Sequence, residues 1–141
     1  MKALLLTLFV VLLAGTVEAH AEPVVVVNAA SAVPQLSQDA VINIFLGRYR
    51  TLPTGGTARP IDQPENSVVR AEFYRRLVNK DLTEITAYWS RLLFSGRTSP
   101  PLQAATAADV LALMMAYPDS VAYVDRSQVD KRLRIVMEFP K

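Results

Sequence analysis

The sequence contains no cysteine, and its one histidine, His20, lies close to the N-terminus. A disulfide scaffold and a lipid-bearing N-terminal cysteine are therefore both excluded, so the fold must depend on a packed core. The common nucleophile and base pairs and the usual zinc ligands are also missing. The carboxylates match no calcium-binding loop. We therefore expect a protein that is not an enzyme and that has no metal or cofactor.

Charge of either sign is scarce. The chain has 15 basic and 13 acidic residues and a formal net charge of +2. Such a small surplus does not favour a nucleic-acid partner, although it is compatible with anions in general.

The chain also has few long hydrophobic runs. Residues 3–15 form the longest one, but a membrane-spanning helix needs about 20 apolar residues. A polar stretch and then Ala19-His20-Ala21 follow, which is the small-x-small pattern of a signal-peptidase site. Cleavage after Ala19 fits this pattern nearly as well as cleavage after Ala21. We expect residues 1–21 to be a signal peptide and residues 22–141 to form a single periplasmic domain without a membrane span.

Short apolar runs predict the strands. A β-branched run at residues 23–27 is typical of a strand buried on both faces, and residues 121–124 predict another. Residues 60–62 form a short extended segment before a turn. Residues 133–139 alternate, which predicts a final half-buried strand. In that strand we expect the following side chains to point inward: Leu133, Ile135, Met137 and Phe139. The others, Arg134, Val136 and Glu138, are expected to point outward.

Cap residues and apolar spacing predict four helices. The expected starts are Ser37, Ser67, Asp81 and Thr106, and the expected ends are Gly47, Asn79, Ser95 and Pro118. Tyr88 and Trp89 stand at helical spacing with Ile85, which predicts core positions rather than a binding platform. Together with the strands, these helices predict an α/β fold in which about four helices flank a small mixed sheet.

The segment from Ile61 to Arg70 is the candidate site, because it carries polar side chains to the N-terminus of the second helix. Free N–H groups and a partial positive charge at such an end favour an anion. An alternative interpretation uses the same residues. In it, Ser67 or Asn66 caps the helix, Asp62 accepts hydrogen bonds from backbone N–H groups of the turn, and Arg70 faces solvent.

Three apolar and aromatic signatures follow one another along the chain: IFLGR at residues 44–48, AYWSRLLFSG at residues 87–96 and VAYVD at residues 121–125. Their order and spacing resemble the short, single-lobe family of phosphate ABC transporter substrate-binding proteins. The resemblance covers roughly residues 24–125. It implies a single lobe of the type II periplasmic-binding-protein-like fold.

The resemblance also implies a ligand, phosphate or another small oxyanion, and a set of ligand-binding residues. Asp62 would match the acidic residue that accepts a proton from phosphate, Ser67 a hydroxyl donor and Arg70 a nearby cation, with Asn66 beside them. In the family these positions belong to an Arg-Ser-Asp-Gly-Ser-Gly-Thr type loop. Here the glycines are absent, and Pro64 and Glu65 interrupt the loop.

Two functional hypotheses remain open on the sequence. In the first, the protein binds phosphate or a similar oxyanion and works with an ABC permease, a second lobe or another periplasmic protein. In the second, the protein keeps the lobe fold, has lost ligand binding and acts as a protein-interaction module. The departure from the glycine-rich loop favours the second hypothesis, and the resemblance favours the first.

Overall fold

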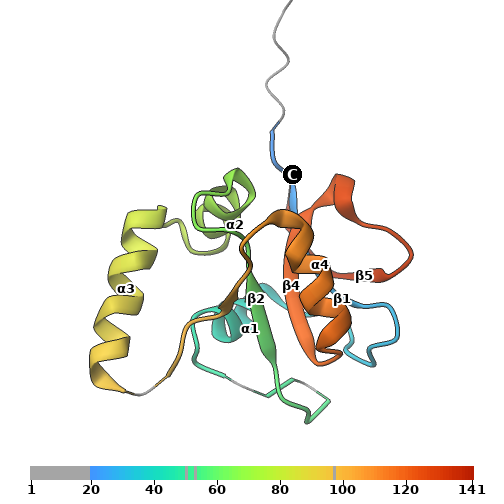
Figure 1. The fold of residues 1–141 in the computed structure, drawn as a ribbon, viewed down its shortest axis with the longest axis horizontal. Helices are drawn as coiled ribbons and strands as arrows, with labels where there is room; N and C mark the ends of the chain where they lie inside the picture. Colours follow the sequence, from blue (N-terminus) through green and yellow to red (C-terminus); the bar gives the residue numbers. More distant parts are fainter. Residues whose placement is uncertain (1–19, 50, 53, 97) are drawn as a thin grey trace, which may run out of the picture.

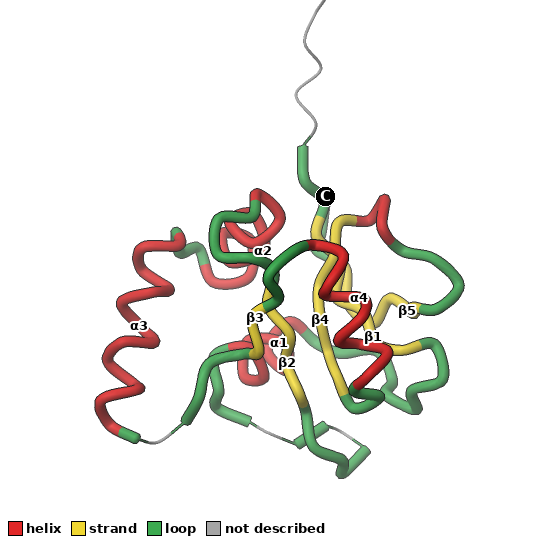
Figure 2. Tube along the Cα trace, viewed as in Figure 1, coloured by secondary structure: helices red, strands yellow, loops and turns green. Residues whose placement is uncertain are grey.

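A computed structural model describes residues 20–49, 51–52, 54–96 and 98–141. The expected signal peptide therefore lies outside the described residues, apart from its last two. The described chain forms the following elements (Figures 1 and 2): β1 (Pro23–Asn28), α1 (Gln38–Phe45), β2 (Arg59–Asp62), α2 (Val68–Val78), α3 (Leu82–Ser95), β3 (Leu102–Gln103), α4 (Ala107–Ala116), β4 (Ser120–Asp125), a 3-10 turn η1 (Arg126–Gln128) and β5 (Leu133–Glu138).

The strands form one mixed sheet in the order β3-β2-β4-β1-β5. β2 runs parallel to β3 and β4, whereas β1 runs antiparallel to both of its neighbours. Alternate side chains of β1 enter two separate hydrophobic clusters. Val25 and Val27 pack with α1, α2 and α3, and Val24 and Val26 pack with α4 on the opposite face. The predicted α/β fold, a small mixed sheet flanked by four helices, is thus confirmed.

The helix starts are where the cap residues predict them. Ser37, Ser67, Asp81 and Thr106 are all N-caps whose side chains accept a backbone hydrogen bond. Both Asp81 and Thr106 form reciprocal capping boxes with the acidic residue three positions later. These four starts depend on local hydrogen bonds, which is why the sequence shows them.

The predicted alternation in the last strand holds up to Ile135 and is wrong beyond it, because Leu133 and Ile135 pack in the cluster beneath α4 whereas Met137 and Phe139 pack in the cluster on the opposite face. Val136, expected to point outward, is fully buried. The register between β1 and β5 shifts at this point, because Val26 pairs with Ile135 while Val25 pairs with Met137. Val136 is the extra residue of a β-bulge, and such a residue turns the side chains that follow it to the other face.

The outer side of β5 is covered by the loop between β1 and α1. The backbone N–H of Leu36 donates to the carbonyl of Val136 at 2.8 Å, and the Gln35 side chain donates to the carbonyl of Ile135 at 3.2 Å. From β5, the Arg134 guanidinium donates to the carbonyls of Ser31 and Val33. This loop therefore occupies part of the hydrogen-bonding capacity of the sheet edge.

Helix α3 confirms one core prediction and refines another. Ile85 and Trp89 are buried, whereas Tyr88 is half-buried and donates its hydroxyl hydrogen to the Leu46 carbonyl at 2.6 Å. Among the described residues, no helix has the length and apolar character needed to cross a membrane.

Candidate functional site

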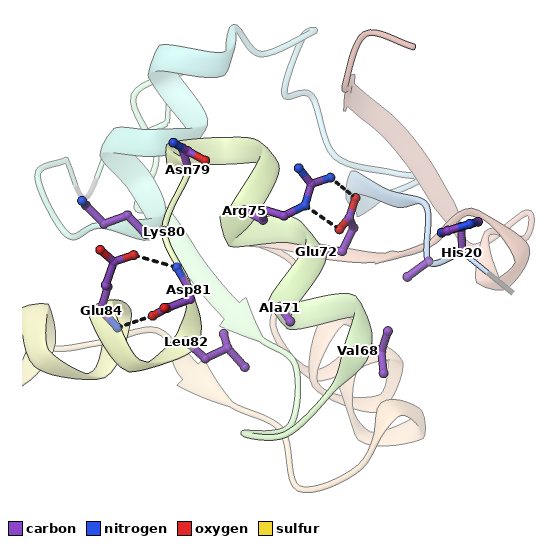
Figure 3. A pocket seen from close by; sticks show the side chains of 11 residues that line it. His20, Val68, Ala71, Glu72, Arg75, Asn79, Lys80, Asp81, Leu82 and Glu84 are labelled. Atoms are coloured by element: carbon purple, nitrogen blue, oxygen red, sulfur yellow. Dashed lines mark hydrogen bonds and ion pairs between the residues drawn. The ribbon is translucent and has the colours of Figure 1, made fainter. Parts of the chain in front are cut away.

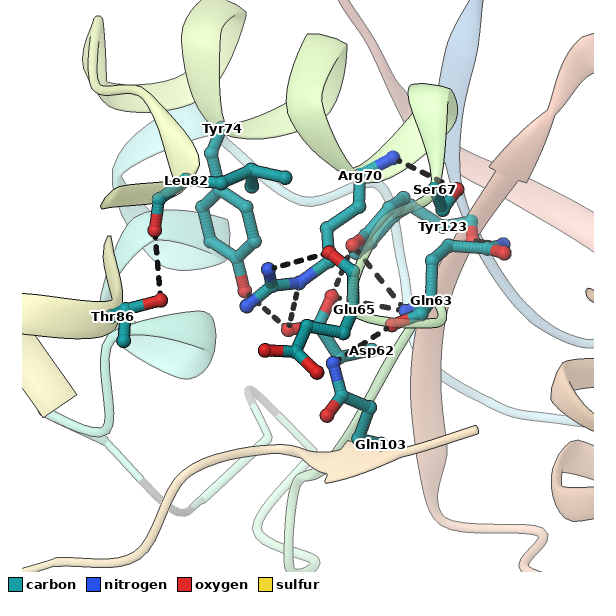
Figure 4. A network of polar contacts seen from close by, with 10 residues as sticks. All are labelled: Asp62, Gln63, Glu65, Ser67, Arg70, Tyr74, Leu82, Thr86, Gln103 and Tyr123. Atoms are coloured by element: carbon teal, nitrogen blue, oxygen red, sulfur yellow. Dashed lines mark hydrogen bonds and ion pairs between the residues drawn. The ribbon is translucent and has the colours of Figure 1, made fainter. Parts of the chain in front are cut away.

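A buried polar network lies where β2 leads into α2 (Figure 4). Asp62, at the end of β2, is only 3% exposed, and Arg70, in the first turn of α2, is 6% exposed. The Arg70 Nε donates to Asp62 Oδ2 at 3.1 Å, and the Tyr74 hydroxyl donates to the same oxygen at 3.0 Å. The other carboxylate oxygen accepts from the Tyr123 hydroxyl and from the Gln63 backbone N–H. Both oxygens of Asp62 are therefore engaged inside the protein.

The electrostatics of the network favour an ion pair between Arg70 and Asp62, with Tyr74 and Tyr123 both neutral beside it. Burial alone would lower the pKa of Arg70, but the charge and hydrogen bond of Asp62 outweigh burial, so this pKa is raised. Burial, and then the negative charge of Asp62, raise the pKa values of Tyr74 and Tyr123 well above their usual range. At neutral pH both tyrosines are therefore protonated hydrogen-bond donors.

The N-terminus of α2 has one donor capped and others free. Ser67 has an extended backbone, and its Oγ accepts from the Arg70 backbone N–H at 3.2 Å. In the part of the chain that the structure describes, nothing accepts from the backbone N–H of Val68 or Val69. Asn66 precedes them and is exposed. The capping role of Ser67 is thus confirmed, while the end of the helix still offers donors.

The alternative interpretation, in which these residues only cap the helix and complete the turn, is right for Asp62 and wrong for Arg70. Asp62 does accept a hydrogen bond from a backbone N–H of the turn, that of Gln63, at 3.0 Å. Arg70, however, does not face solvent as that interpretation expected, because it is buried against Asp62. The partner of Arg70 comes from the preceding strand, and only the fold brings the two together.

A surface depression of about 440 Å³ lies beside this network, between the start of α2 and the first half of α3. Arg70 lines it together with Glu65, Asn66, Leu82, Thr83, Thr86, Ala87 and Ser90. The Arg70 Nη1 donates to the Glu65 carbonyl at 3.2 Å, and no described residue accepts from Nη2. The depression therefore combines the remaining donor of the Arg70 guanidinium, Nη2, with hydroxyl and amide groups of its other lining residues.

A larger hollow, of about 530 Å³, lies on the outer face of α2 (Figure 3). Glu72 and Arg75, which line it, already pair with each other at 2.6 Å, and Glu72 also accepts from the nearby Arg76 at 2.7 Å. The hydrogen bond from Arg75, supported by Arg76, lowers the pKa of Glu72 to about 2 despite partial burial. Glu72 is therefore negatively charged at neutral pH. Its charge makes this hollow a poorer place for an anion than the depression beside Arg70.

The sequence matches no protein-family model and no curated protein. Among solved structures it is similar to a protein of Clostridium perfringens described as a phosphate ABC transporter substrate-binding protein, with phosphate bound. That match has a TM-score of 0.64 and 12% identity, and it covers 82% of this chain and 44% of the other.

Two further similarities agree with the first. An ABC-type phosphate transport receptor of Vibrio cholerae matches with a TM-score of 0.64, 14% identity and coverage of 82% and 45%. PstS of Borrelia burgdorferi matches with a TM-score of 0.62, 12% identity and coverage of 86% and 49%.

The chain has the fold of one lobe of a periplasmic binding protein. It spans less than half the length of each of these structures, between 44% and 49%. The first two are named as phosphate-transport proteins, so the expected fold family is supported at low sequence identity.

The structure brings the four sequence-predicted site residues, Asp62, Asn66, Ser67 and Arg70, to one turn of chain. It adds residues that the sequence did not indicate. Tyr74 stands four positions after Arg70, a spacing that places both on one helix face. Tyr123 belongs to the third sequence signature, but its contact with Asp62 depends on the pairing of β2 with β4.

Proposed function

We propose that this chain is a secreted, periplasmic binding module of the phosphate-transport type, which holds phosphate or a similar small oxyanion at the N-terminus of α2. The proposal extends the likeness of fold to a likeness of ligand. In it, Asn66, Ser67 and the free N–H groups of Val68 and Val69 face the anion. Arg70 supplies the positive charge, and Asp62 positions the Arg70 guanidinium.

The observation that carries the proposal is that Arg70 is nearly buried and still has a hydrogen-bond donor without an acceptor among the described residues. A nearly buried guanidinium lines the depression beside a helix N-terminus, and its Nη2 has no acceptor among the described residues. Guanidinium groups and helix N-termini both favour oxyanions. The pairing of Arg70 with Asp62 and the carboxylate of Glu65 reduce the local positive charge, which supports modest rather than tight binding.

A depression on a single lobe can supply only one wall of a ligand-binding cleft. High-affinity ligand sites bury most of the ligand surface, and an open depression beside a single lobe does not. The chain also spans less than half of the phosphate-transport proteins that it resembles. We therefore propose that a second lobe, either another copy of this chain or another periplasmic protein, closes over the anion.

Thermal unfolding with millimolar phosphate tests the anion site, with sulfate and chloride at equal ionic strength as controls. A ligand that binds only the folded state at 100 times its dissociation constant adds about 2.7 kcal/mol to the free energy of unfolding. We expect phosphate to raise the melting temperature. The effect should disappear in Asn66→Ala and weaken in Arg70→Lys, which keeps the charge but loses the planar guanidinium. It should persist in Gln128→Ala, which removes an exposed amide far along the chain from the site.

A second candidate function is favoured by the end of α3. Phe94 is 95% exposed and Leu93 is 56% exposed, and α3 stands at one side of the molecule (Figure 1). Exposed apolar side chains that lie together mark protein-interaction surfaces more often than isolated ones do. A chain that shows no phosphate effect, and whose cross-linking to a periplasmic partner is lost in Phe94→Ser, would favour the interaction module over the anion site.

A further inference from the structure

A second groove lies at the other end of α2, where the last turns of α1 and α2 meet the first half of α3. It has a volume of about 370 Å³ and is walled mainly by apolar side chains. They are Ile42 and Leu46 from the end of α1, Leu77 and Val78 from α2, and Ile85 and Tyr88 from α3. We name it the three-helix groove.

The walls of the three-helix groove are firmly placed. Leu77 is 3% exposed and Ile85 is 1% exposed, so the floor belongs to the hydrophobic core. The Tyr88 hydroxyl donates to the Leu46 carbonyl at 2.6 Å and ties α3 to the end of α1. Since that hydroxyl is already bonded to the protein, the wall that Tyr88 contributes is chiefly its ring.

Cations surround this apolar surface. Arg48 and Lys80 line the three-helix groove itself, and Arg91 lies with Lys80 and Tyr88 in an adjoining hollow of about 220 Å³. In the described ranges, none of these three side chains has an ion pair. By contrast, these arginines pair with a carboxylate: Arg59, Arg70, Arg75, Arg76, Arg126 and Arg132.

One acidic residue, Glu84, lies in the adjoining hollow. Its carboxylate accepts the Asp81 backbone N–H at 2.9 Å as part of the capping box of α3 (Figure 3). Lys80 lies near it in that view, but no ion pair joins them within 4 Å. The positive charges around the groove therefore exceed the negative ones.

We infer that the three-helix groove binds a small amphipathic anion, an aliphatic carboxylate, with its hydrocarbon chain on the apolar walls and its carboxylate between Arg48 and Lys80. The groove volume falls in the range of small-molecule sites, about 300–1,000 Å³. Apolar walls and rim cations match the two ends of such a ligand. This site lies at the C-terminal end of α2, roughly 15 Å of helix away from Ser67, so it is separate from the proposed oxyanion site.

The test uses decanoate as the probe and the whole chain as the protein. Trp89 is the only tryptophan, and its ring centroid lies 5.2 Å from that of Tyr88, so its fluorescence reports on the groove wall. Calorimetry gives an independent dissociation constant. We expect saturable binding of decanoate, and much weaker binding both of butyrate, which keeps the charge, and of decanol, which keeps the chain.

Matched variants distinguish binding at the three-helix groove from nonspecific attraction of an anion to the positive charge of the protein. The pair Arg48→Gln and Lys80→Gln should weaken decanoate binding by about tenfold, which lies within the range for two exposed ion pairs. The pair Lys131→Gln and Lys141→Gln makes the same change of net charge elsewhere and should leave binding unaltered. Val78→Phe, which fills the groove, should abolish decanoate binding and leave the response to phosphate as it is in the parent protein.

Three results would overturn the inference. They are an absence of saturable decanoate binding, equal affinity for decanol, or an affinity that neither the Arg48 and Lys80 pair nor Val78→Phe alters. Each can occur whether or not phosphate binds at α2, so the two proposals fail independently.

Discussion

Helices α2 and α3 follow each other directly in the chain, but they are attached to the protein by different means. In α2, Phe73, Tyr74 and Leu77 are buried together with the charged Arg70. Phe73 stacks on Tyr123 of the sheet with ring centroids 3.6 Å apart. The longer α3 buries two residues, Ile85 and Trp89, and carries the exposed Phe94 in its last turn.

The difference shows that the length of a helix does not measure how firmly it is held. Side chains fix α2 to two strands of the sheet, and its buried ion pair makes its position dependent on β2. A reciprocal capping box fixes the start of α3, and core contacts fix its first two turns. We therefore expect substitutions in the α2 network to affect the whole fold, and substitutions along α3 to have effects that fall toward its C-terminus.

The largest effect is expected from Asp62→Asn, which removes the charge that faces buried Arg70. Removing one partner of a buried ion pair costs about 3–5 kcal/mol, because the other charge stays buried and uncompensated. Urea unfolding measures this loss. As a control, the double variant Asp62→Leu with Arg70→Met should be less destabilised than Asp62→Leu or Arg70→Met alone. A loss of stability below about 1 kcal/mol for Asp62→Asn would contradict the importance of the ion pair.

A smaller effect is expected from Tyr123→Phe, which deletes one donor to Asp62 while keeping the aromatic stack on Phe73. A hydrogen bond to a charged group contributes about 1.5–3 kcal/mol to stability. The matched control is Tyr117→Phe, because the Tyr117 ring packs under Arg59 and its hydroxyl has no hydrogen bond to a described residue. Equal melting temperatures for the two variants would show that the Tyr123 hydroxyl adds nothing to the network.

At the start of α3, Asp81→Ala should cost about 1 kcal/mol by removing the N-cap. Asp81→Asn keeps a side-chain oxygen that accepts from the Glu84 backbone N–H and should lose only a few tenths of that amount. Chemical denaturation distinguishes the two variants. If both lose the same stability, the charge of Asp81 rather than its capping hydrogen bond supports the helix.

The smallest effect is expected from Phe94→Ser at the end of α3. The Phe94 side chain is almost fully exposed, so its loss should change the free energy of unfolding by no more than about 0.5 kcal/mol. Calorimetric melting of the variant beside the parent checks this. A loss above about 1 kcal/mol would mean that Phe94 packs against the protein in solution and that α3 is held along its whole length.

Features that depend on neighbouring residues could be predicted from the sequence. The N-caps at Ser67 and Asp81 follow from local hydrogen bonds, and β1 follows from an unbroken β-branched run. The two-residue strand β3 could not be predicted, because such a short element has no periodicity. The burial of Val136 could not be predicted either, because the bulge exists only through the pairing of β5 with β1.

The candidate site shows the same limit. Asp62, Ser67 and Arg70 lie within nine residues, so they could be selected together from local sequence. Their relationship could not, since an arginine in a helix ordinarily predicts a solvated position, and its burial depends on Asp62, Tyr74 and Tyr123 converging. Whether the site holds an anion stays a prediction that the phosphate experiment decides.

The edges of the sheet have a consequence for the behaviour of the protein at high concentration. A long, flat edge strand is a template on which other chains add strands and aggregate. Here β3 offers only two residues, and β5 is bulged and covered in part by the loop that contains Leu36. We therefore expect this small sheet to resist edge-to-edge polymerisation, so that assembly is directed to its helical surfaces.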